Sequence, residues 1–165
     1  AMDMGLLNKI YLRFPAQFWD LTLRNFGLVK APKGTFPFWI DQQQISGEPI
    51  IGGLITGDFA LGLEQKTDSD IVSEAMQALR SMFGPNISDP TDFTITRWMG
   101  DPYSYGSYSQ LAVGAQPEMR QDLGQSVSNK LFFAGEATDS DYPSTVHGAY
   151  SSGARAAQSI SSVAG

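Results

Sequence analysis

The chain lacks cysteine and has a single histidine among its 165 residues. The absence of cysteine excludes disulfides, thiolate nucleophiles and cysteine-based zinc sites. With one histidine, a histidine-rich metal site and a complete serine–histidine–aspartate arrangement are both hard to build. These absences leave the common thiol, zinc and triad centres without their main residues.

Positive charge is scarce as well. Eleven Lys and Arg residues stand against 17 Asp and Glu residues, so the net charge is -6, and no basic cluster occurs. This balance argues against a nucleic-acid surface. An acidic surface could attract cationic substrates, although plain solubility explains the same charge. Because no apolar run approaches membrane-spanning length and no signal peptide is visible, we expect a soluble protein, and we favour the cytoplasm as its compartment.

Hydrophobic residues make up 42% of the chain, which is enough for one folded domain with a real core. In residues 8–14, Ile, Leu and Phe alternate with Lys, Tyr and Arg, and this period of two predicts a strand. We predict further strands at residues 36–41 and 92–99. Residues 49–64 read as a strand whose glycines mark positions where another backbone or a ligand comes close. An aromatic-rich loop is expected at residues 100–115.

The clearest predicted helix covers residues 68–85. Thr67 and Asp70 supply caps and negative charge at its start, and the pair Gly84-Pro85 ends it. Together with the strands, this helix places the chain in a mixed α and β class. Its apolar stripe consists of Ile71, Val72, Ala75, Met76, Leu79, Met82 and Phe83.

The C-terminal stretch KLFFAGEATDSDYPSTVHGAYSSGARAA begins at Lys130 with a short apolar run that stops at Gly-Glu. We expect a buried strand at residues 130–137 and a long helix at residues 144–165. Glycine inside a helix costs about 1 kcal/mol relative to alanine, so Gly148 and Gly153 need a reason. Close packing of the helix is one reason, and a planar or anionic ligand pressed against the helix N-terminus is the other.

Residues 131–157 closely resemble the C-terminal flavin-binding segment of the FAD-dependent amine oxidase family, and most of all its polyamine oxidases and flavin-dependent histone demethylases. GLLNKIYLRFPAQFWD at residues 5–20 and TRWMGDPYSYGSYSQLAVG at residues 96–114 resemble two further motifs of this family, in the same order. Three matches in series over nearly the whole chain carry more weight than any one of them. The resemblance implies an α+β fold, with residues 1–128 as part of the mixed sheet of the substrate-binding subdomain. Residues 129–165 would be the last strand and helix of the FAD-binding domain.

The resemblance also implies roles for single residues. Lys9 matches the catalytic lysine that holds a water against the reactive N5 of FAD, whereas an ordinary lysine on such a strand would be a solvated surface charge. Gly135 and Glu136 match the strand end that approaches the ribityl and phosphate part of FAD, with a sugar hydroxyl as the expected partner of the carboxylate. Thr145 and Val146 match the helix start whose backbone meets the pyrimidine edge of the isoalloxazine ring. The helix dipole there would stabilise negative charge on the ring.

Aromatic residues are implied for the substrate cavity. Trp98 and Tyr108 match positions that pack near the flavin and wall the cavity, and Tyr103 is a further candidate for the same wall. Thr145 belongs to this cavity too, because it stands where monoamine oxidases carry a second cage tyrosine. Aromatic faces suit an amine through cation–π attraction and apolar contact, although core packing remains the alternative for each ring.

Two departures from the family pattern bear on the cofactor. Ser107 occupies the position at which monoamine oxidases tether flavin through cysteine, so we expect FAD to bind non-covalently. The chain contains no G-x-G-x-x-G loop, although the family binds the FAD pyrophosphate with one. We therefore expect an incomplete FAD site here, completed by the N-terminal FAD-binding part of the same protein.

The activity implied by the resemblance is amine oxidation. A small-molecule amine would lose hydride to flavin N5, the imine would hydrolyse, and O2 would reoxidise the flavin with release of hydrogen peroxide. We expect the isolated 165 residues to bind FAD poorly and to turn over nothing. Two alternatives remain: a non-catalytic interaction module that kept the oxidase fold, and an L-amino-acid oxidase in which Arg13 or Arg97 would bind the substrate carboxylate.

Overall fold

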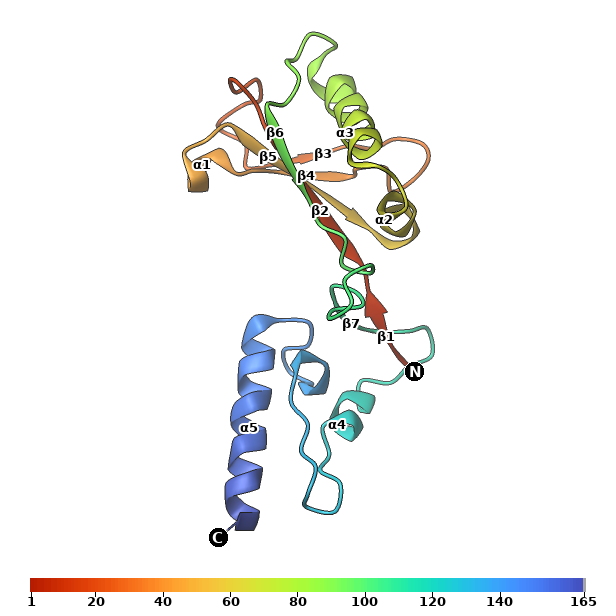
Figure 1. Cartoon of the computed structure of the whole chain (residues 1–165), viewed down its shortest axis with the longest axis vertical. Coiled ribbons are helices and arrows are strands. Elements are labelled where there is room, and N and C mark those ends of the chain that lie inside the picture. Colours follow the sequence, from red (N-terminus) through yellow and green to blue (C-terminus); the bar gives the residue numbers. More distant parts are fainter. Residues whose placement is uncertain (165) are drawn as a thin grey trace. The chain divides into compact units, whose positions relative to one another are not determined.

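Strand β2 (Leu7–Arg13) lies inside a five-stranded antiparallel sheet in the computed structural model, which describes residues 1–164 (Figure 1). The strand order is β3-β4-β5-β2-β6, and β2 pairs with both β5 and β6. The predicted strands overlap β2 and contain β4, β5 and β6, although two of them run past the ends of β5 and β6, and no prediction covers β3. The partner strands are β3 (Asn25–Gly27), β4 (Phe38–Asp41), β5 (Ile50–Thr56) and β6 (Asp92–Ile95).

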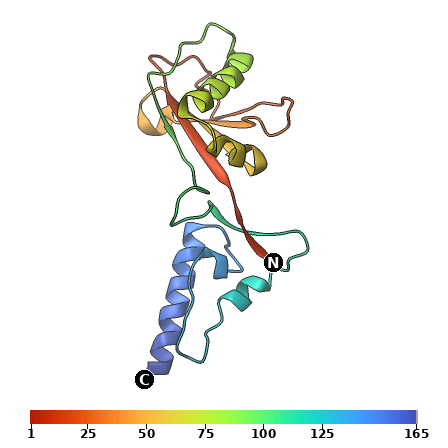
Figure 2. The same ribbon diagram turned by 45° about the vertical axis from the view of Figure 1, so that its right-hand side comes forward.

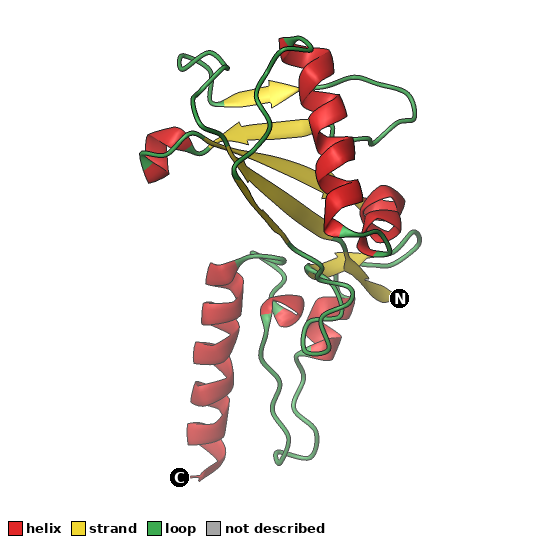
Figure 3. Cartoon of the chain, turned by 45° about the horizontal axis from the view of Figure 1, so that its top comes forward, coloured by secondary structure: helices red, strands yellow, loops and turns green. Residues whose placement is uncertain are grey.

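Helices α2 (Gly57–Glu64) and α3 (Asp68–Phe83) pack on one face of this sheet (Figure 3). The predicted apolar stripe of α3 is the face that is buried. Thr67 caps this helix by accepting the N–H of Asp70 at 3.2 Å, and Gly84 ends it, so both predicted boundaries are confirmed. A short helix, α1 (Gln43–Ser46), follows β4. The core of this region contains Ile10, Leu12, Phe14, Trp39, Ile51, Ile55, Leu63, Ile71, Met76 and Leu79.

The strand predicted over residues 49–64 ends at Thr56. At Gly57 the backbone adopts a φ of +61°, a conformation that side chains disfavour, and the chain turns into α2. The apolar residues after this turn follow a helical spacing that a short window cannot separate from a strand. The prediction of a strand is therefore wrong for residues 57–64.

Two glycines of β5 make room for aromatic rings. A Cβ on Gly52 would lie 2.9 Å from the ring of Tyr11, and a Cβ on Gly53 would lie 2.7 Å from the ring of Trp39. We expected another backbone or a ligand at these positions, and that expectation is wrong, because side chains of the neighbouring strands cover both glycines.

The chain forms two compact units. One consists of residues 6–106 with the five-stranded sheet. The other consists of residues 1–5 and the chain from Ser107 onward. The expected boundary between parent domains at residues 128 and 129 stays a prediction. No helix in residues 1–164 combines the length and apolar character needed to cross a bilayer.

The second unit contains a short antiparallel ribbon and the C-terminal helix (Figure 2). Its strand β7 lies in the predicted aromatic-rich loop, and its helix α4 lies in a stretch with no predicted element. Helix α5 confirms the predicted final helix from Val146 to Ala164, while residue 165 lies outside the described residues. The elements of this unit are β1 (Met2–Gly5), β7 (Tyr108–Leu111), α4 (Met119–Leu123), the 3-10 turn η1 (Glu136–Thr138) and α5 (Val146–Ala164).

Two strand predictions fail near these elements. Strand β6 stops at Ile95 instead of residue 99, because the chain turns after it. The buried strand expected at residues 130–137 is absent from the described chain, where Leu131 forms an isolated bridge with Val127 and the side chains of Leu131 and Phe133 are exposed. A strand needs a neighbour to satisfy its backbone groups, and this stretch has that one bridge. The α+β class itself is confirmed, with antiparallel pairing in every strand pair of the described residues.

Candidate functional site

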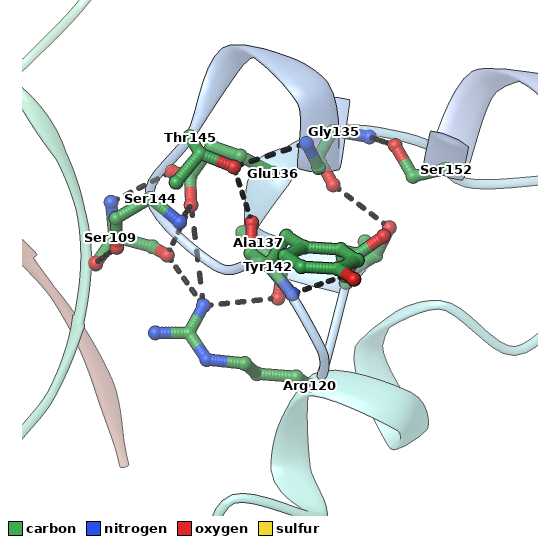
Figure 4. Close-up of polar contacts among 12 residues, drawn as sticks. Ser109, Arg120, Gly135, Glu136, Ala137, Tyr142, Ser144, Thr145 and Ser152 are labelled. Carbon is green, nitrogen blue, oxygen red and sulfur yellow. Dashed lines mark hydrogen bonds and ion pairs between the residues drawn. The ribbon is translucent and has the colours of Figure 1, made fainter. Parts of the chain in front are cut away.

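A single carboxylate, that of Glu136 in η1, ties strand β7 to the turn that precedes α5 (Figure 4). Its Oε1 accepts the N–H of Ser109 at 2.7 Å. Its Oε2 accepts the hydroxyl of Ser109 and the N–H of Ser144, each at 2.7 Å. The hydroxyl of Ser144 donates to the carbonyl of Ser109 at 2.6 Å. These bonds hold three segments of the second unit together at one point.

Arg120 of α4 completes this group of residues. The residue is buried at 5% exposure, and Nη1 donates to the hydroxyl oxygen of Ser109 at 2.6 Å and to the carbonyl of Ala137 at 3.4 Å. The same nitrogen lies 4.0 Å from Oε2 of Glu136. A buried charge is tolerated when it is paired and hydrogen-bonded, and this guanidinium meets both conditions. We call Ser109, Arg120, Glu136 and Ser144 the Glu136 cluster.

The Glu136 cluster keeps its carboxylate ionised. Burial alone would raise the pKa of Glu136, but the hydrogen bonds from Ser109 and Ser144 and the charge of Arg120 outweigh it, so the pKa lies below its usual value. A carboxylate offers about four acceptor positions, of which three are filled here. The remaining position, on Oε1, suits one further donor such as a sugar hydroxyl.

Gly135, directly before η1, presents bare backbone beside this carboxylate. Its N–H donates to the hydroxyl of Ser152 on α5 at 2.8 Å, which fixes the glycine to the helix. Its φ is +141°, and no atom lies within 4 Å of the position that a Cβ would occupy. The positive φ disfavours any residue with a side chain at this position, and glycine leaves the space in front of the backbone open.

The first turn of α5 faces outward. Thr145 caps it, because its hydroxyl accepts the N–H of Gly148 at 3.0 Å and donates to the carbonyl of Tyr142 at 2.7 Å. Val146 is 88% exposed. The first N–H groups of a helix have no acceptor within the helix, and the N-terminal end of its dipole is positive. This helix start can therefore receive the acceptor edge of a ligand.

The two glycines of α5 have different explanations. A Cβ on Gly148 would lie 2.0 Å from the carbonyl oxygen of Tyr142, so Gly148 allows the helix to pack closely on the preceding loop. No atom lies within 4 Å of the corresponding position at Gly153. Of the two explanations offered for glycine in this helix, close packing or a bound ligand, close packing therefore applies to Gly148.

Lys9 lies on β2 in the other unit. Because Asn8 and Ile10 point into the core, the side chain of Lys9 points to the face of the sheet that the helices leave uncovered. Its N–H donates to the hydroxyl of Thr96 at 2.8 Å, and its carbonyl accepts the N–H of Thr96 at 3.0 Å. In residues 1–164 its ammonium group forms neither a hydrogen bond nor an ion pair with a side chain.

The aromatic candidates differ in their surroundings. Trp98 is partly buried in the turn after β6, where its carbonyl accepts the N–H of Gly106 at 2.8 Å. Tyr103 is 96% exposed and lines no wall within its own unit. Tyr108 is partly buried on β7, in the other unit. Their role as cavity walls stays a prediction.

The structure thus brings three predicted residues together in the second unit, namely Gly135, Glu136 and Thr145 (Figure 4), and Val146 follows Thr145 as the first residue of α5. Sequence reasoning missed their supports, above all Arg120, whose short helix is too brief to show a periodic pattern. In residues 1–164 no group of three or more histidine, aspartate or glutamate residues is placed to hold a metal ion.

Comparisons with known proteins identify a family and a fold. A family model described as flavin containing amine oxidoreductase matches residues 1–161. The chain is 40% identical over 169 residues to lysine-specific histone demethylase 1 homolog 2 of Arabidopsis thaliana, covering 99% of this chain and 23% of that protein. It is 36% identical over 165 residues to lysine-specific histone demethylase 1 homolog 1 of Oryza sativa subsp. japonica, covering 96% of this chain and 19% of that protein.

The fold has a counterpart among solved structures. Wild-type putrescine oxidase bound to putrescine matches with a TM-score of 0.79 at 15% sequence identity, over 99% of this chain and 36% of that one. At this identity the match concerns the fold alone. The chain spans about a quarter of the length of the Arabidopsis relative and about a third of this structure.

Proposed function

The chain belongs to the family of flavin-containing amine oxidoreductases, and on this basis we propose that it forms the C-terminal part of an FAD-dependent amine oxidase. The observation that carries the proposal is the connection from Gly135 to Val146. It combines bare backbone with open space, an ionised carboxylate with one free acceptor position, and an outward-facing helix start. Each of these features fits one part of a flavin nucleotide.

Three groups of this connection would hold FAD. Gly135 gives close access to the backbone, Glu136 would accept a hydroxyl of the ribityl chain, and the first N–H groups of α5 would face the pyrimidine edge of the ring. When bound, FAD supplies the oxidising chemistry, accepting a hydride from the carbon next to the amine nitrogen and passing the electrons to O2 to give hydrogen peroxide. The positive end of α5 would favour the negative charge that the ring gains. Without cysteine this chain offers no thioether link to the flavin, and we propose that FAD binds non-covalently.

Lys9 is the residue of this chain that we place nearest the reaction. An ammonium group has three donors and no acceptor, and that of Lys9 has no carboxylate partner among residues 1–164. It can therefore donate to a water and orient it. We assign Lys9 the role of holding the water that participates in flavin turnover.

The proposed substrate is an alkyl amine. Trp98 and Tyr108, with Tyr103 and Thr145, would wall its cavity, since aromatic faces attract a cation and desolvation favours the neutral amine that can lose a hydride. Relatives named lysine-specific histone demethylases make a methylated lysine side chain the first candidate, and the fold match to putrescine oxidase makes a diamine the second. The net charge of -6 is compatible with either cationic substrate.

An L-amino-acid oxidase has less support. Such an enzyme needs an arginine for the substrate carboxylate, but Arg97 already donates to Asp68 at 2.6 Å and to the carbonyl of Lys66 at 3.2 Å. Arg13 lies exposed at the end of β2. Neither guanidinium lies in an enclosed position suited to binding a substrate carboxylate.

The test uses the full-length protein, purified with its flavin. We expect acid precipitation to release FAD into solution, and anaerobic mixing with either a methyl-lysine peptide or putrescine to bleach the oxidised-flavin absorbance. Lysine without methyl groups and an L-amino acid serve as comparison substrates. A protein that carries no flavin, or whose flavin no amine reduces, would favour the non-catalytic interaction module instead.

A further inference from the structure

A buried polar side chain joins the strand that carries Lys9 to the turn that carries Trp98. Asn8 of β2 is 1% exposed. Its Oδ1 accepts the hydroxyl of Thr96 at 3.1 Å and the N–H of Trp98 at 3.1 Å. Its Nδ2 donates to Oε1 of Glu64 at 2.6 Å. The oxygen of the Asn8 amide therefore contacts the segment after β6, and its nitrogen contacts α2.

Glu64, the last residue of α2, extends this arrangement along the turn. Its Oε1 also accepts the N–H of Met99 at 3.0 Å, and its Oε2 accepts the N–H of Gly100 at 2.8 Å. No lysine or arginine forms an ion pair with this carboxylate in residues 1–164. The negative charge is held by amide donors alone: the side chain of Asn8 on β2 and two backbone N–H groups of the turn.

The turn needs these bonds because the sheet no longer supplies them. Strand β6 ends at Ile95, so the N–H groups of residues 98–100 have no partner strand. Side chains take over: Asn8 binds the first of these N–H groups, and Glu64 binds the next two. The position of the Trp98 backbone is thus set by two polar side chains instead of a ladder of backbone bonds.

The same cluster fixes Lys9. Thr96, whose hydroxyl donates to Asn8, accepts the N–H of Lys9 with the same oxygen and donates its own N–H to the carbonyl of Lys9. Asn8 and Lys9 are neighbours on one strand, so their side chains point to opposite faces of the sheet. Any shift of Asn8 in the core would move Lys9 on the other face.

We propose that Asn8 and Glu64 are positioning residues that hold Lys9 and Trp98 in their working arrangement for amine oxidation. This inference rests on the proposed function. Neither residue needs to touch substrate or flavin. Both act through the backbone of the residues that do, and misplacement of a reacting group by about 1 Å can cost roughly 100-fold in rate.

The test is a double-mutant cycle in the full-length flavoprotein. Asn8→Asp keeps the size of the side chain but replaces the donor that faces Glu64 with an acceptor. We expect it to slow anaerobic flavin reduction by the amine roughly 10- to 100-fold, with the flavin content unchanged. In a Lys9→Met background the same substitution should slow the reaction by a several-fold smaller factor, because the part of its effect that acts through Lys9 is already lost and the part through Trp98 remains. Asp41→Asn, a buried change of the same size elsewhere in this sheet, is the matched control and should leave the rate unchanged.

Equal slowing by Asn8→Asp in both backgrounds, or slowing no larger than that of Asp41→Asn, would overturn the positioning role while leaving the oxidase intact. Should Asn8→Asp fail to fold, Glu64→Gln replaces it, since it keeps the size and one acceptor, and the same cycle is read with it. An unmodified protein that no amine reduces overturns the proposed function and this inference together.

Discussion

Lys9 differs from the other lysines of the five-stranded unit in being half-buried on a central strand with its ammonium unpaired. Lys66, for comparison, forms an ion pair with Glu74, and Lys30 is an exposed loop residue. An unpaired ammonium group loses hydration without gaining a carboxylate, so its place is explained better by a bound water or ligand than by fold stability.

We predict that Lys9→Met slows flavin turnover in the full-length protein by roughly 100-fold, the scale of a positioned proton donor or acceptor. Methionine keeps the length and apolar stem, so stability should change little. Stopped-flow absorbance of the flavin measures the effect, and Lys30→Met is the control. An unchanged rate in Lys9→Met would remove Lys9 from the mechanism.

Arg120 is a second residue whose loss has a defined consequence. Replacing it with methionine leaves the hydroxyl oxygen of Ser109 and the carbonyl of Ala137 without their donor, and Glu136 without its cation. We expect Arg120→Met to lower the free energy of unfolding by about 1–3 kcal/mol, as for a buried group left without its partner. The exposed Arg155 also donates hydrogen bonds within this unit. Replacing it with methionine should lower the free energy of unfolding by less than about 1 kcal/mol. Urea denaturation compares the two variants, and equal losses would contradict the assignment.

Sequence reasoning finds a single residue when a motif contains it. It misses a residue whose role depends on contacts with residues far away in the sequence. Gly135, Glu136 and Val146 were found because their motif resembles a known family. Asn8 and Glu64 lie 56 positions apart, and Arg120 and Ser109 lie 11 apart, so no local pattern links either pair. Their importance follows from burial and hydrogen bonding, which the fold alone reveals.

At the scale of elements, helix α5 offers a matched pair of glycines. A methyl group at Gly148 would overlap the backbone carbonyl of Tyr142, which has no flexible end to move away, whereas a methyl group at Gly153 meets no atom within 4 Å. We predict that Gly148→Ala lowers the free energy of unfolding by about 1–3 kcal/mol through overpacking. Gly153→Ala should raise it by up to about 1 kcal/mol through helix propensity. Thermal unfolding followed by circular dichroism tests both signs, and equal effects of the two substitutions would contradict this packing.

Elements were predictable where one face of the chain is buried. The alternation that predicted β2 is that of Ile10, Leu12 and Phe14, all of which lie in the core. The apolar residues Leu131 and Phe133 carry the same composition, but no neighbouring strand covers them in residues 1–164. Strands β1 and β7 escaped prediction because their pairing joins residues about a hundred positions apart and leaves no strong alternation.

At the scale of the whole chain, two carboxyls of the second unit link stability to pH. Burial opposes ionisation of Glu136, but hydrogen bonds from Ser109 and Ser144 and the charge of Arg120 lower its pKa below the ordinary 4.5. The N–H of Tyr142 is the main cause that lowers the pKa of Asp139 below the ordinary 3.8. A group whose pKa is lowered by folding stabilises the folded state above its unfolded pKa and loses that contribution as the pH falls through its folded pKa.

We therefore predict that the melting temperature of the chain is flat near neutral pH and falls as the pH drops below about 4.5. Replacing Glu136 with glutamine should flatten this acid limb, because the amide does not titrate. A melting temperature that stays constant down to pH 3, or an acid limb that Glu136→Gln leaves unaltered, would count against this linkage.

FAD titration, followed by the quenching of flavin fluorescence, tests the central claim most directly, because the claim is that this chain supplies one part of a shared flavin site. The account predicts tight, stoichiometric FAD in the full-length protein and binding weaker than about 100 µM by the isolated 165 residues. A dissociation constant of about 1 µM for the isolated chain, or a full-length protein that takes up no FAD, would contradict it.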